Sequence, residues 1–258
     1  MRYLSTRGHP ERRRFCEILL EGLAPDGGLA IPQTLPTITS EQLQAWRALP
    51  YHALAAEILS IFITDIPRSA LEALTREAYK PSSFQSEDIV PLRELDGGMY
   101  LLGLSEGPTL AFKDMAMQLL GNLFEYALRR AQQDLNILGA TSGDTGGAVA
   151  SGFLGVDGVD VVILYPSGKV SDIQEKQLTT LGQNIKALEV NGVFDDCQDM
   201  VKKAFLDESL KHKNLTSANS INIARWLPQM FYFFFAYKQL KKYGKPLIVS
   251  CPSGNFGN

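Results

Sequence analysis

The chain has 258 residues, of which 45% are hydrophobic and 21% charged, and its formal net charge is −3. This composition is typical of a globular protein long enough for two domains, and its mild acidity gives no reason to expect nucleic acid or a membrane as partner. The three cysteines, Cys16, Cys197 and Cys251, have no paired spacing, which argues against a disulfide framework or a metal site and predicts a reducing, cytoplasmic location.

The first part of the chain, residues 1–88, is predicted to form a helical N-terminal domain. An amphipathic segment occurs around residues 15–23, and two or three further helices are expected between residues 40 and 79. Residues 80–83, with the sequence KPSS, are predicted to be a linker. Residues 89–258 would then form the second domain.

One lysine lies among apolar residues at an expected helix start, in the stretch GPTLAFKD at 107–114. Apolar residues recur at helical spacing from Ala116 to Ala131, so Lys113 is expected in or just before the first turn. The positive end of a helix and an apolar environment both disfavour an ammonium, whereas Asp114 acts in the opposite direction. The neutral amine is the nucleophile that forms a Schiff base with an aldehyde. The alternative interpretation is a surface lysine near a helix start.

From residue 136 onwards, short apolar runs alternate with helical stretches. Strands are predicted at 136–140, 159–165, 185–190 and 215–217, and helices at 146–154, 171–181 and 195–210. This alternation is typical of a parallel sheet covered by helices. A long helix over 223–243 and a strand over 246–251 follow. Residues 115–220 would therefore form a first α/β subdomain with four parallel strands, and 245–258 would begin a second one.

Two glycine-rich loops follow predicted strands and are suited to anions. The first, TSGDTGG at 141–147, combines flexible glycines, a helix N-terminus and the hydroxyls of Thr141, Ser142 and Thr145. The second, PSGNFGN at 252–258, has the same features and predicts a phosphate site. Neither loop has the glycine spacing of an ATP- or NAD-binding motif. For the first loop, the alternative is a tight strand-to-helix turn capped by serine or aspartate.

A third polar segment, residues 217–225, lies at the end of the fourth predicted strand. Ligands of open parallel sheets bind at the carboxyl ends of strands, so Asn219, Ser220, Asn222 and Arg225 are candidate donors there. The alternative, favoured when the segment is considered alone, is helix capping by asparagine or serine beside a solvated arginine.

A lysine suited to a Schiff base and two anion loops on an α/β scaffold together indicate pyridoxal 5′-phosphate as cofactor. Over its whole length, the chain closely resembles the threonine synthases, a family within the tryptophan-synthase-like (fold type II) pyridoxal-phosphate enzymes. The motifs that carry the resemblance are YLSTRG at 3–8, GLAPDGGLAIP at 22–32, GPTLAFKD at 107–114, ATSGDTGGA at 140–148, ILYPSGKVSDIQEKQ at 163–177, SANSINIARW at 217–226 and PSGNFGN at 252–258.

The resemblance implies the fold of the tryptophan synthase β subunit, an α/β parallel sheet flanked by helices, with a helical N-terminal domain. It also implies conversion of O-phospho-L-homoserine and water to L-threonine and phosphate, the last step of threonine biosynthesis. Lys113 would hold the cofactor as a Schiff base and, once displaced by substrate, serve as base and acid at the α and β carbons. Phosphate would leave from the γ carbon, and water would add at the β carbon.

The resemblance assigns the remaining site residues by position. The cofactor residues would be Lys113, Asp144, Ser253, Gly254, Asn255, Phe256, Gly257 and Asn258. The substrate residues would be Thr141, Ser142, Gly143, Thr145, Lys169, Asn219, Ser220, Asn222 and Arg225. Lys169 and the segment 219–225 are the candidates for the substrate's phosphate group. No metal is expected, and the protein would be a monomer or a homodimer.

The chain departs from the family pattern in two places. Glu106 occupies a position where the family often has histidine, and its charge would alter the site if it faced inward. Family members also continue well beyond the 252–258 loop. We therefore expect the 258 residues to be an N-terminal fragment that binds cofactor weakly and turns over no substrate. Full activity at the intact mass of 258 residues would refute this expectation.

Two other functions remain open. Another fold type II enzyme, such as threonine dehydratase or cysteine synthase, shares the lysine and the glycine loops, and release of ammonia from threonine or serine would favour it. A non-catalytic threonine-synthase-like binding protein is the other alternative. The STRG and APDGG motifs of the N-terminal domain favour a threonine synthase over the first alternative, and the presence of Lys113 and both glycine loops argues against the second for the parent protein.

Overall fold

The structure is a computed structural model that describes residues 1–218, 221–240 and 246–251. The N-terminal part is mainly helical, as predicted. Its helices are α1 (Phe15–Glu21), α2 (Ser40–Ala45), α3 (Tyr51–Phe62) and α4 (Arg68–Ala78), with 3-10 turns η1 (Trp46–Ala48) and η2 (Pro81–Ser83). The predicted linker at 80–83 therefore contains a turn of 3-10 helix.

Local sequence explains where these helices start and which face they bury. The Thr39 hydroxyl accepts from the Gln42 backbone N–H at 3.2 Å, and the Gln42 side chain accepts from the Thr39 N–H at 2.9 Å. This capping box satisfies two backbone donors at the start of α2. In α4, the buried residues Leu71, Thr75 and Ala78 recur at helical spacing, which gives the helix one face towards the core.

Two small antiparallel sheets were not predicted from the sequence. Strand β1 (Tyr3–Ser5) pairs antiparallel with β2 (Ala30–Pro32), and β3 (Leu92–Glu94) pairs antiparallel with β4 (Tyr100–Leu102). Each strand has three residues. That length is too short for an alternating pattern to be recognised.

The second part contains the predicted four-stranded parallel sheet. Its strands are β5 (Leu135–Ala140), β6 (Val159–Pro166), β7 (Ile185–Val190) and β8 (Leu215–Thr216), in the spatial order β7-β6-β5-β8. All of the pairings are parallel, and β8 pairs through only two residues, Leu215 with Asn136 and Thr216 with Ile137. The fold is therefore α/β with a parallel sheet, as expected.

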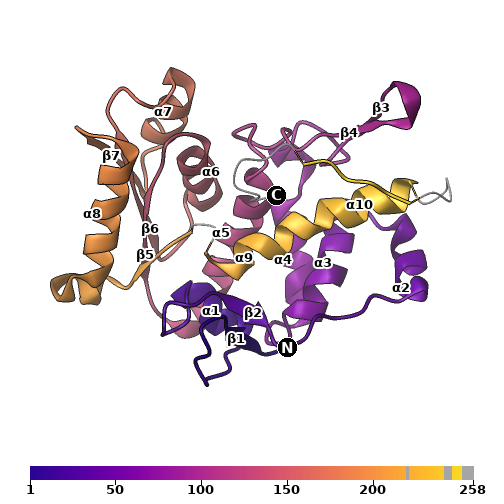
Figure 1. The fold of residues 1–258 in the computed structure, drawn as a ribbon, viewed down its shortest axis with the longest axis horizontal. Helices are drawn as coiled ribbons and strands as arrows, with labels where there is room; N and C mark the ends of the chain where they lie inside the picture. The colour runs from indigo at the N-terminus through magenta and orange to yellow at the C-terminus, as the bar shows by residue number, and fades with distance from the viewer. Residues whose placement is uncertain (219–220, 241–245, 252–258) are drawn as a thin grey trace.

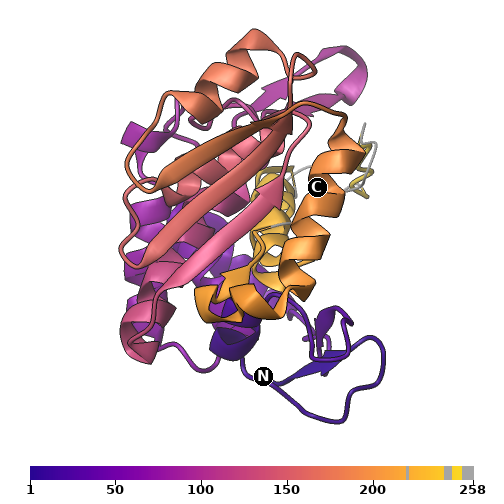
Figure 2. The ribbon, with the colours of Figure 1, turned by 90° about the vertical axis from the view of Figure 1, so that its left-hand side faces the viewer.

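Helices cover both faces of this sheet. They are α5 (Asp114–Ala131), α6 (Asp144–Phe153), α7 (Asp172–Thr179) and α8 (Phe194–Leu206), followed by a 3-10 segment, η4 (Glu208–Lys213). Helix α8 lies on one face, and α5 and α6 lie on the other (Figure 2). Figure 1 shows the α/β part beside the N-terminal helices, with α5 between them.

One hydrophobic core joins the two parts. The hydroxyl of Tyr79, on the N-terminal side, donates to the backbone oxygen of Met115 in α5 at 2.7 Å. A single cluster of buried apolar residues includes Phe15 and Leu59 from the N-terminal part and Leu120 and Val161 from the α/β part. The predicted division of the chain after residue 88 stays a prediction.

Two predictions near the end of the described chain are wrong. The helix expected over 223–243 is divided into α9 (Ile223–Trp226), the 3-10 segment η5 (Leu227–Met230) and α10 (Phe231–Leu240), and residues 241–243 lie outside the described part. Pro228 lies in the 3-10 segment and has no N–H for an α-helical hydrogen bond.

The strand expected over 246–251 is also absent from those described residues. Ile248 is 89% exposed there, and its apolar neighbours Leu247 and Val249 are exposed as well. An apolar run becomes a strand only where a neighbouring strand supplies hydrogen-bond partners.

Among the described helices, none has both the length and the apolar character needed to cross a membrane.

Helices α5 and α6 cross at two glycines, with their backbones in close contact. A Cβ on Gly121 would overlap the backbone oxygen of Gly152, and a Cβ on Gly152 would lie 2.6 Å from the backbone oxygen of Met117. Only glycine permits this approach, although glycine costs about 1 kcal/mol relative to alanine within a helix. The rings of Phe124 and Phe153 pack edge to face nearby, with centroids 5.3 Å apart.

Candidate functional site

Lys113 lies immediately before the first residue of α5, where the sequence placed it. The residue is only 6% exposed, so the alternative of a surface lysine is wrong. Its Nζ donates to Oδ2 of Asp144 at 2.6 Å and lies 4.9 Å from the centre of the Phe112 ring. This contact joins the lysine motif to the first glycine loop.

Asp144 is the first residue of α6, where a negative charge interacts favourably with the helix N-terminus. Its side chain is 45% exposed, whereas that of Lys113 is 8% exposed. Asp144 therefore supplies the acidic partner of Lys113, a contact that the sequence analysis did not predict.

Asp114 instead holds the loop that precedes Lys113. It is fully buried, and its two oxygens accept hydrogen bonds from the Thr109 backbone N–H at 2.8 Å and the Thr109 hydroxyl at 2.7 Å. Burial raises the pKa of the Asp114 carboxyl, although the hydrogen bonds from Thr109 act against that shift. A Cβ on Gly107 would lie 2.5 Å from Oδ2 of Asp114, so the loop backbone packs directly on this carboxyl group.

The loop 141–147 is shaped by Thr141. The Thr141 hydroxyl oxygen accepts from the backbone N–H of Gly143 at 3.1 Å and of Gly146 at 2.9 Å, and the hydroxyl donates to the Gly143 oxygen at 3.0 Å. Thr141 is buried, Thr145 is half-buried and Ser142 is exposed. The hydroxyl predicted to face substrate therefore organises the loop, and Ser142 and Thr145 are the more accessible members.

Of the four candidate donors in the segment 217–225, the structure describes Asn222 and Arg225. Asn222 is fully buried; its amide donates to the Leu19 oxygen at 2.9 Å and accepts from the Ala224 N–H at 3.0 Å. These contacts confirm the capping interpretation for Asn222, while its role as a substrate residue stays a prediction. Asn219 and Ser220 lie outside the described residues.

Arg225 is not the solvated arginine of the alternative interpretation. It is 6% exposed, and its Nη1 lies 3.5 Å from the Ala218 backbone oxygen. Burial lowers the pKa of Arg225 to about 10, and the Asp144 carboxylate acts in the opposite direction. The negative charge of Asp144 therefore acts on both Arg225 and Lys113.

The remaining predicted residues are described by other contacts than those around Lys113 and Asp144, or lie outside the described residues. Lys169 is exposed in the turn after β6, where its backbone N–H donates to the Pro166 oxygen at 3.2 Å. Glu106 is half-buried, and its backbone oxygen accepts from the Gln85 N–H at 2.8 Å; the role of its side chain stays a prediction. The predicted cofactor residues at 253–258 lie outside the described part of the chain.

Two glutamines of α7 contact the site and were not singled out from the sequence. Gln177 Nε2 donates to the Thr109 backbone oxygen at 3.3 Å. A Cβ on Gly143 would lie 2.9 Å from Gln174 Oε1, so this side chain covers the glycine loop. Both lie within the motif at 163–177, and their spacing of three residues places them on one face of α7.

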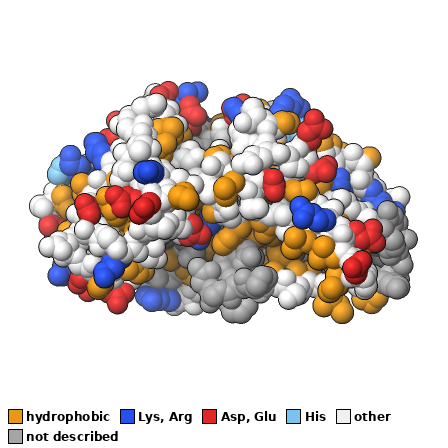
Figure 3. Space-filling model, turned by 90° about the horizontal axis from the view of Figure 1, so that it is seen from above, with side chains coloured by type: hydrophobic (Ala, Val, Ile, Leu, Met, Phe, Trp, Pro, Cys, Tyr) orange, Lys and Arg blue, Asp and Glu red, His pale blue; other side chains and the backbone are white. Residues whose placement is uncertain are grey.

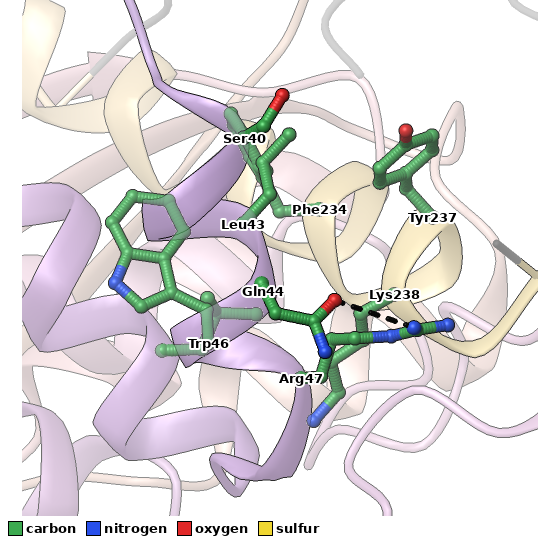
Figure 4. A pocket seen from close by; sticks show the side chains of 9 residues that line it. Ser40, Leu43, Gln44, Trp46, Arg47, Phe234, Tyr237 and Lys238 are labelled. Atoms are coloured by element: carbon green, nitrogen blue, oxygen red, sulfur yellow. Dashed lines mark hydrogen bonds between the residues drawn. The ribbon is translucent and has the colours of Figure 1, made fainter.

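In the described part of the chain, a very small cavity adjoins the predicted site, and a larger one lies away from it. A hollow of about 10 Å³, with room for about one water, is lined by Thr145, Gly146 and the neighbouring sheet. A separate pocket of about 170 Å³ lies between α2, η1 and α10 (Figure 4). It is lined by Ser40, Leu43, Gln44, Trp46, Arg47, Leu54, Phe234, Tyr237 and Lys238, none of which belongs to the predicted site. Seen from above, hydrophobic side chains gather right of the centre of the molecule, and charged ones are scattered over the whole of this face (Figure 3).

The parallel sheet with its flanking helices has the tryptophan-synthase-like, fold type II architecture. Residues 2–79 match the family described as threonine synthase N terminus. The chain is 47% identical to threonine synthase of Corynebacterium glutamicum and 44% identical to that of Pseudomonas aeruginosa, over 100% of its own length and 55% of each relative. These matches show that the chain belongs to the threonine synthase family, and it spans about half the length of the curated relatives it matches.

Solved structures agree with this assignment. The fold matches the crystal structure of PLP-bound threonine synthase from Brucella melitensis with a TM-score of 0.94 and 43% identity, covering 100% of this chain and 56% of that one. It matches threonine synthase from Escherichia coli with a TM-score of 0.87 and 41% identity, covering 100% of this chain and 59% of that one.

Proposed function

We propose that the protein is a threonine synthase that uses pyridoxal 5′-phosphate to convert O-phospho-L-homoserine and water to L-threonine and inorganic phosphate. The observation that carries the proposal is the 2.6 Å contact between Lys113 Nζ and Asp144. It brings together two motifs, GPTLAFKD and ATSGDTGGA, that have complementary chemistry. The relative from Brucella melitensis is described as PLP-bound, which supports the choice of cofactor.

The residues present fit this cofactor. A buried lysine whose amine lies beside the glycine loop at the N-terminus of α6 is suited to covalent attachment of an aldehyde near anion-binding donors. When bound, the cofactor supplies an electron sink for reactions at the substrate's α and β carbons. We assign its phosphate to residues 253–258 on the strength of their sequence.

The side chains around the proposed cofactor site then have separate roles. The Lys113 amine, when free of the cofactor, accepts and returns protons at the α and β carbons, and Asp144 holds that nitrogen in place. The backbone N–H groups and hydroxyls of loop 141–147 bind the substrate carboxylate at the helix N-terminus. Lys169 and Arg225 supply positive charge for the substrate's phosphate group.

The test is phosphate release from O-phospho-L-homoserine by the protein expressed from its complete reading frame. We expect Lys113→Ala to abolish phosphate release and the visible absorbance of the lysine-bound cofactor. Lys176→Ala, which removes an exposed lysine on α7, should retain both. Persistence of the absorbance band in Lys113→Ala would overturn the assignment of Lys113.

The same experiment separates the alternatives. Release of ammonia from threonine or serine, without phosphate release, would favour another fold type II lyase. Cofactor binding without turnover of either substrate would favour a binding protein.

We propose a cytoplasmic location and a monomeric or homodimeric state. Cys16, Cys197 and Cys251 are free thiols, which fits a reducing compartment.

A further inference from the structure

The loop before Lys113 contains a backbone conformation that needs support. Leu110 has a φ of 62°, in the left-handed region, and is 57% exposed. For a residue with a Cβ this conformation is strained, and such strain persists only where the surroundings hold the backbone in place. The exposed leucine side chain cannot supply that restraint, so it must come from the neighbouring residues.

Thr109 receives this restraint from two directions. Asp114, which follows Lys113, accepts from both the N–H and the hydroxyl of Thr109, at 2.8 and 2.7 Å. On the other side, Gln177 of α7 donates its Nε2 to the Thr109 carbonyl oxygen at 3.3 Å, across 68 residues of sequence. Thr109 is thus bonded at its amide, its hydroxyl and its carbonyl group, immediately before the strained Leu110.

Gln177 also contacts the other half of the site. A Cβ on Gly147 would lie 3.2 Å from Gln177 Oε1, so the amide group lies against the glycine loop as well as the lysine loop. Movement of the lysine loop relative to α7 would stretch the bond to Thr109, and movement of the glycine loop would displace the side chain that donates it. Because Asp114 is adjacent to Lys113 and is bonded to Thr109, that displacement would reach the lysine.

We propose that Gln177 is a positioning residue for Lys113, acting through the hydrogen-bonded chain Gln177–Thr109–Asp114. The role of Lys113 as the cofactor-bearing lysine rests on the proposed function. The hydrogen-bonded chain that positions Lys113 does not depend on the proposed function. The experiments below test the positioning of Lys113 and the proposed function separately.

The test measures amide hydrogen exchange and cofactor attachment in the protein expressed from its complete reading frame. Gln177→Met keeps the length of the side chain but removes the donor, and Thr109→Val keeps the shape but removes the hydroxyl. Each should raise exchange at residues 107–114 about three- to tenfold, the effect of losing one hydrogen bond. Gln239→Met is the matched control, because Gln239 Nε2 donates to the Phe235 backbone oxygen at the same 3.3 Å in α10, away from this loop.

The double variant distinguishes a connected chain from two independent contacts. In a connected chain, Gln177→Met combined with Thr109→Val should raise exchange by less than the product of the single effects. Borohydride fixation of pyridoxal 5′-phosphate on Lys113 should slow by a similar factor in the single variants.

Unchanged exchange at 107–114 in Gln177→Met, multiplicative effects in the double variant, or a rise that extends equally to β5 would overturn the proposal. If Gln177→Met does not fold, Thr109→Val decides the question, since unchanged loop exchange in that variant contradicts the chain. Failure of the unaltered protein to fix cofactor on Lys113 would instead contradict the proposed function, and the exchange data would still decide the role of Gln177.

Discussion

The amine of Lys113 and the carboxylate of Asp144 lie 2.6 Å apart, although 31 residues separate them in the chain. Lys113 precedes α5 and Asp144 begins α6, so the contact joins the N-terminal ends of two packed helices. It places a buried nitrogen beside a loop rich in backbone donors. The pair is therefore the structural centre of the proposed active site.

Replacing Asp144 by asparagine should slow the reaction without unfolding the protein. The amide keeps the shape of the side chain but loses the charge that holds Lys113, and hydrogen bonds to charged groups contribute about 1.5–3 kcal/mol, or roughly 10- to 100-fold. We expect kcat for phosphate release to fall by at least about tenfold. Asp172→Asn, at the exposed first residue of α7, is the control and should retain the unaltered rate. Equal rates in the two variants would show that Asp144 does not act on Lys113.

Replacing Gly146 by alanine should destabilise the glycine loop. The new Cβ would lie 2.6 Å from Cγ2 of the buried Thr141, whose hydroxyl organises the loop. Overpacking of this kind costs about 1–3 kcal/mol in the free energy of unfolding, which urea titration measures. Gly139→Ala in β5 is the matched control, because its Cβ would have no atom within 4 Å. We expect that control to change stability by less than about 0.5 kcal/mol.

Asp114 should give stability a particular dependence on pH. Burial raises its folded pKa above the ordinary value of 3.8, so the folded protein binds this proton more tightly than the unfolded chain does. Stability from this group is present at low pH and is lost as the pH rises from 3.8 through the folded pKa. Urea unfolding between about pH 4 and about pH 7 should show this loss in the unaltered protein. Asp114→Asn should lack that component, and an identical pH profile in the variant would contradict the prediction.

Asn222 should be important for stability. Its amide caps α9 and bonds to the Leu19 oxygen near the end of α1, so Asn222→Ala removes a cap and leaves a buried carbonyl without that donor. Together these losses amount to about 2–4 kcal/mol in the free energy of unfolding. Asn122→Ala, which removes an amide bond to the Gln118 oxygen within α5, should cost less, because its acceptor lies in the same helix. A stable Asn222→Ala protein with a raised KM would instead support the substrate role.

The periodic elements of the fold were predictable from the sequence, and the contacts that join them were not. The apolar run at 185–190 coincides with β7, and the helix after Lys113 begins at Asp114, since both patterns are local. The sequence shows that Asp114 adjoins Lys113, but it does not show the α5–α6 packing that brings Asp144 to the lysine amine. Residues 246–251 show the same limit, since an apolar run does not reveal whether another strand lies beside it.

Local polar chemistry was predicted only in part. The glycine loop at 141–147 lies at the expected strand-to-helix junction, but the use of the Thr141 hydroxyl within the loop depends on its three-dimensional path. Arg225 carries no sequence signal for burial, which arises from the packing of α9 against α1 and α5. Gln177 appeared as an ordinary polar residue of α7, because its acceptor is a backbone oxygen 68 positions away.

The glycine contact between α5 and α6 limits which changes the protein can accept far from Lys113. Where main chain rests against main chain, no side chain can rotate to absorb an added methyl group. Alanine at Gly121 or Gly152 would therefore push the helices apart, and rigid helices transmit that displacement along their length. The spacing of the lysine and its acidic partner is thus set partly by two residues that have no functional groups of their own.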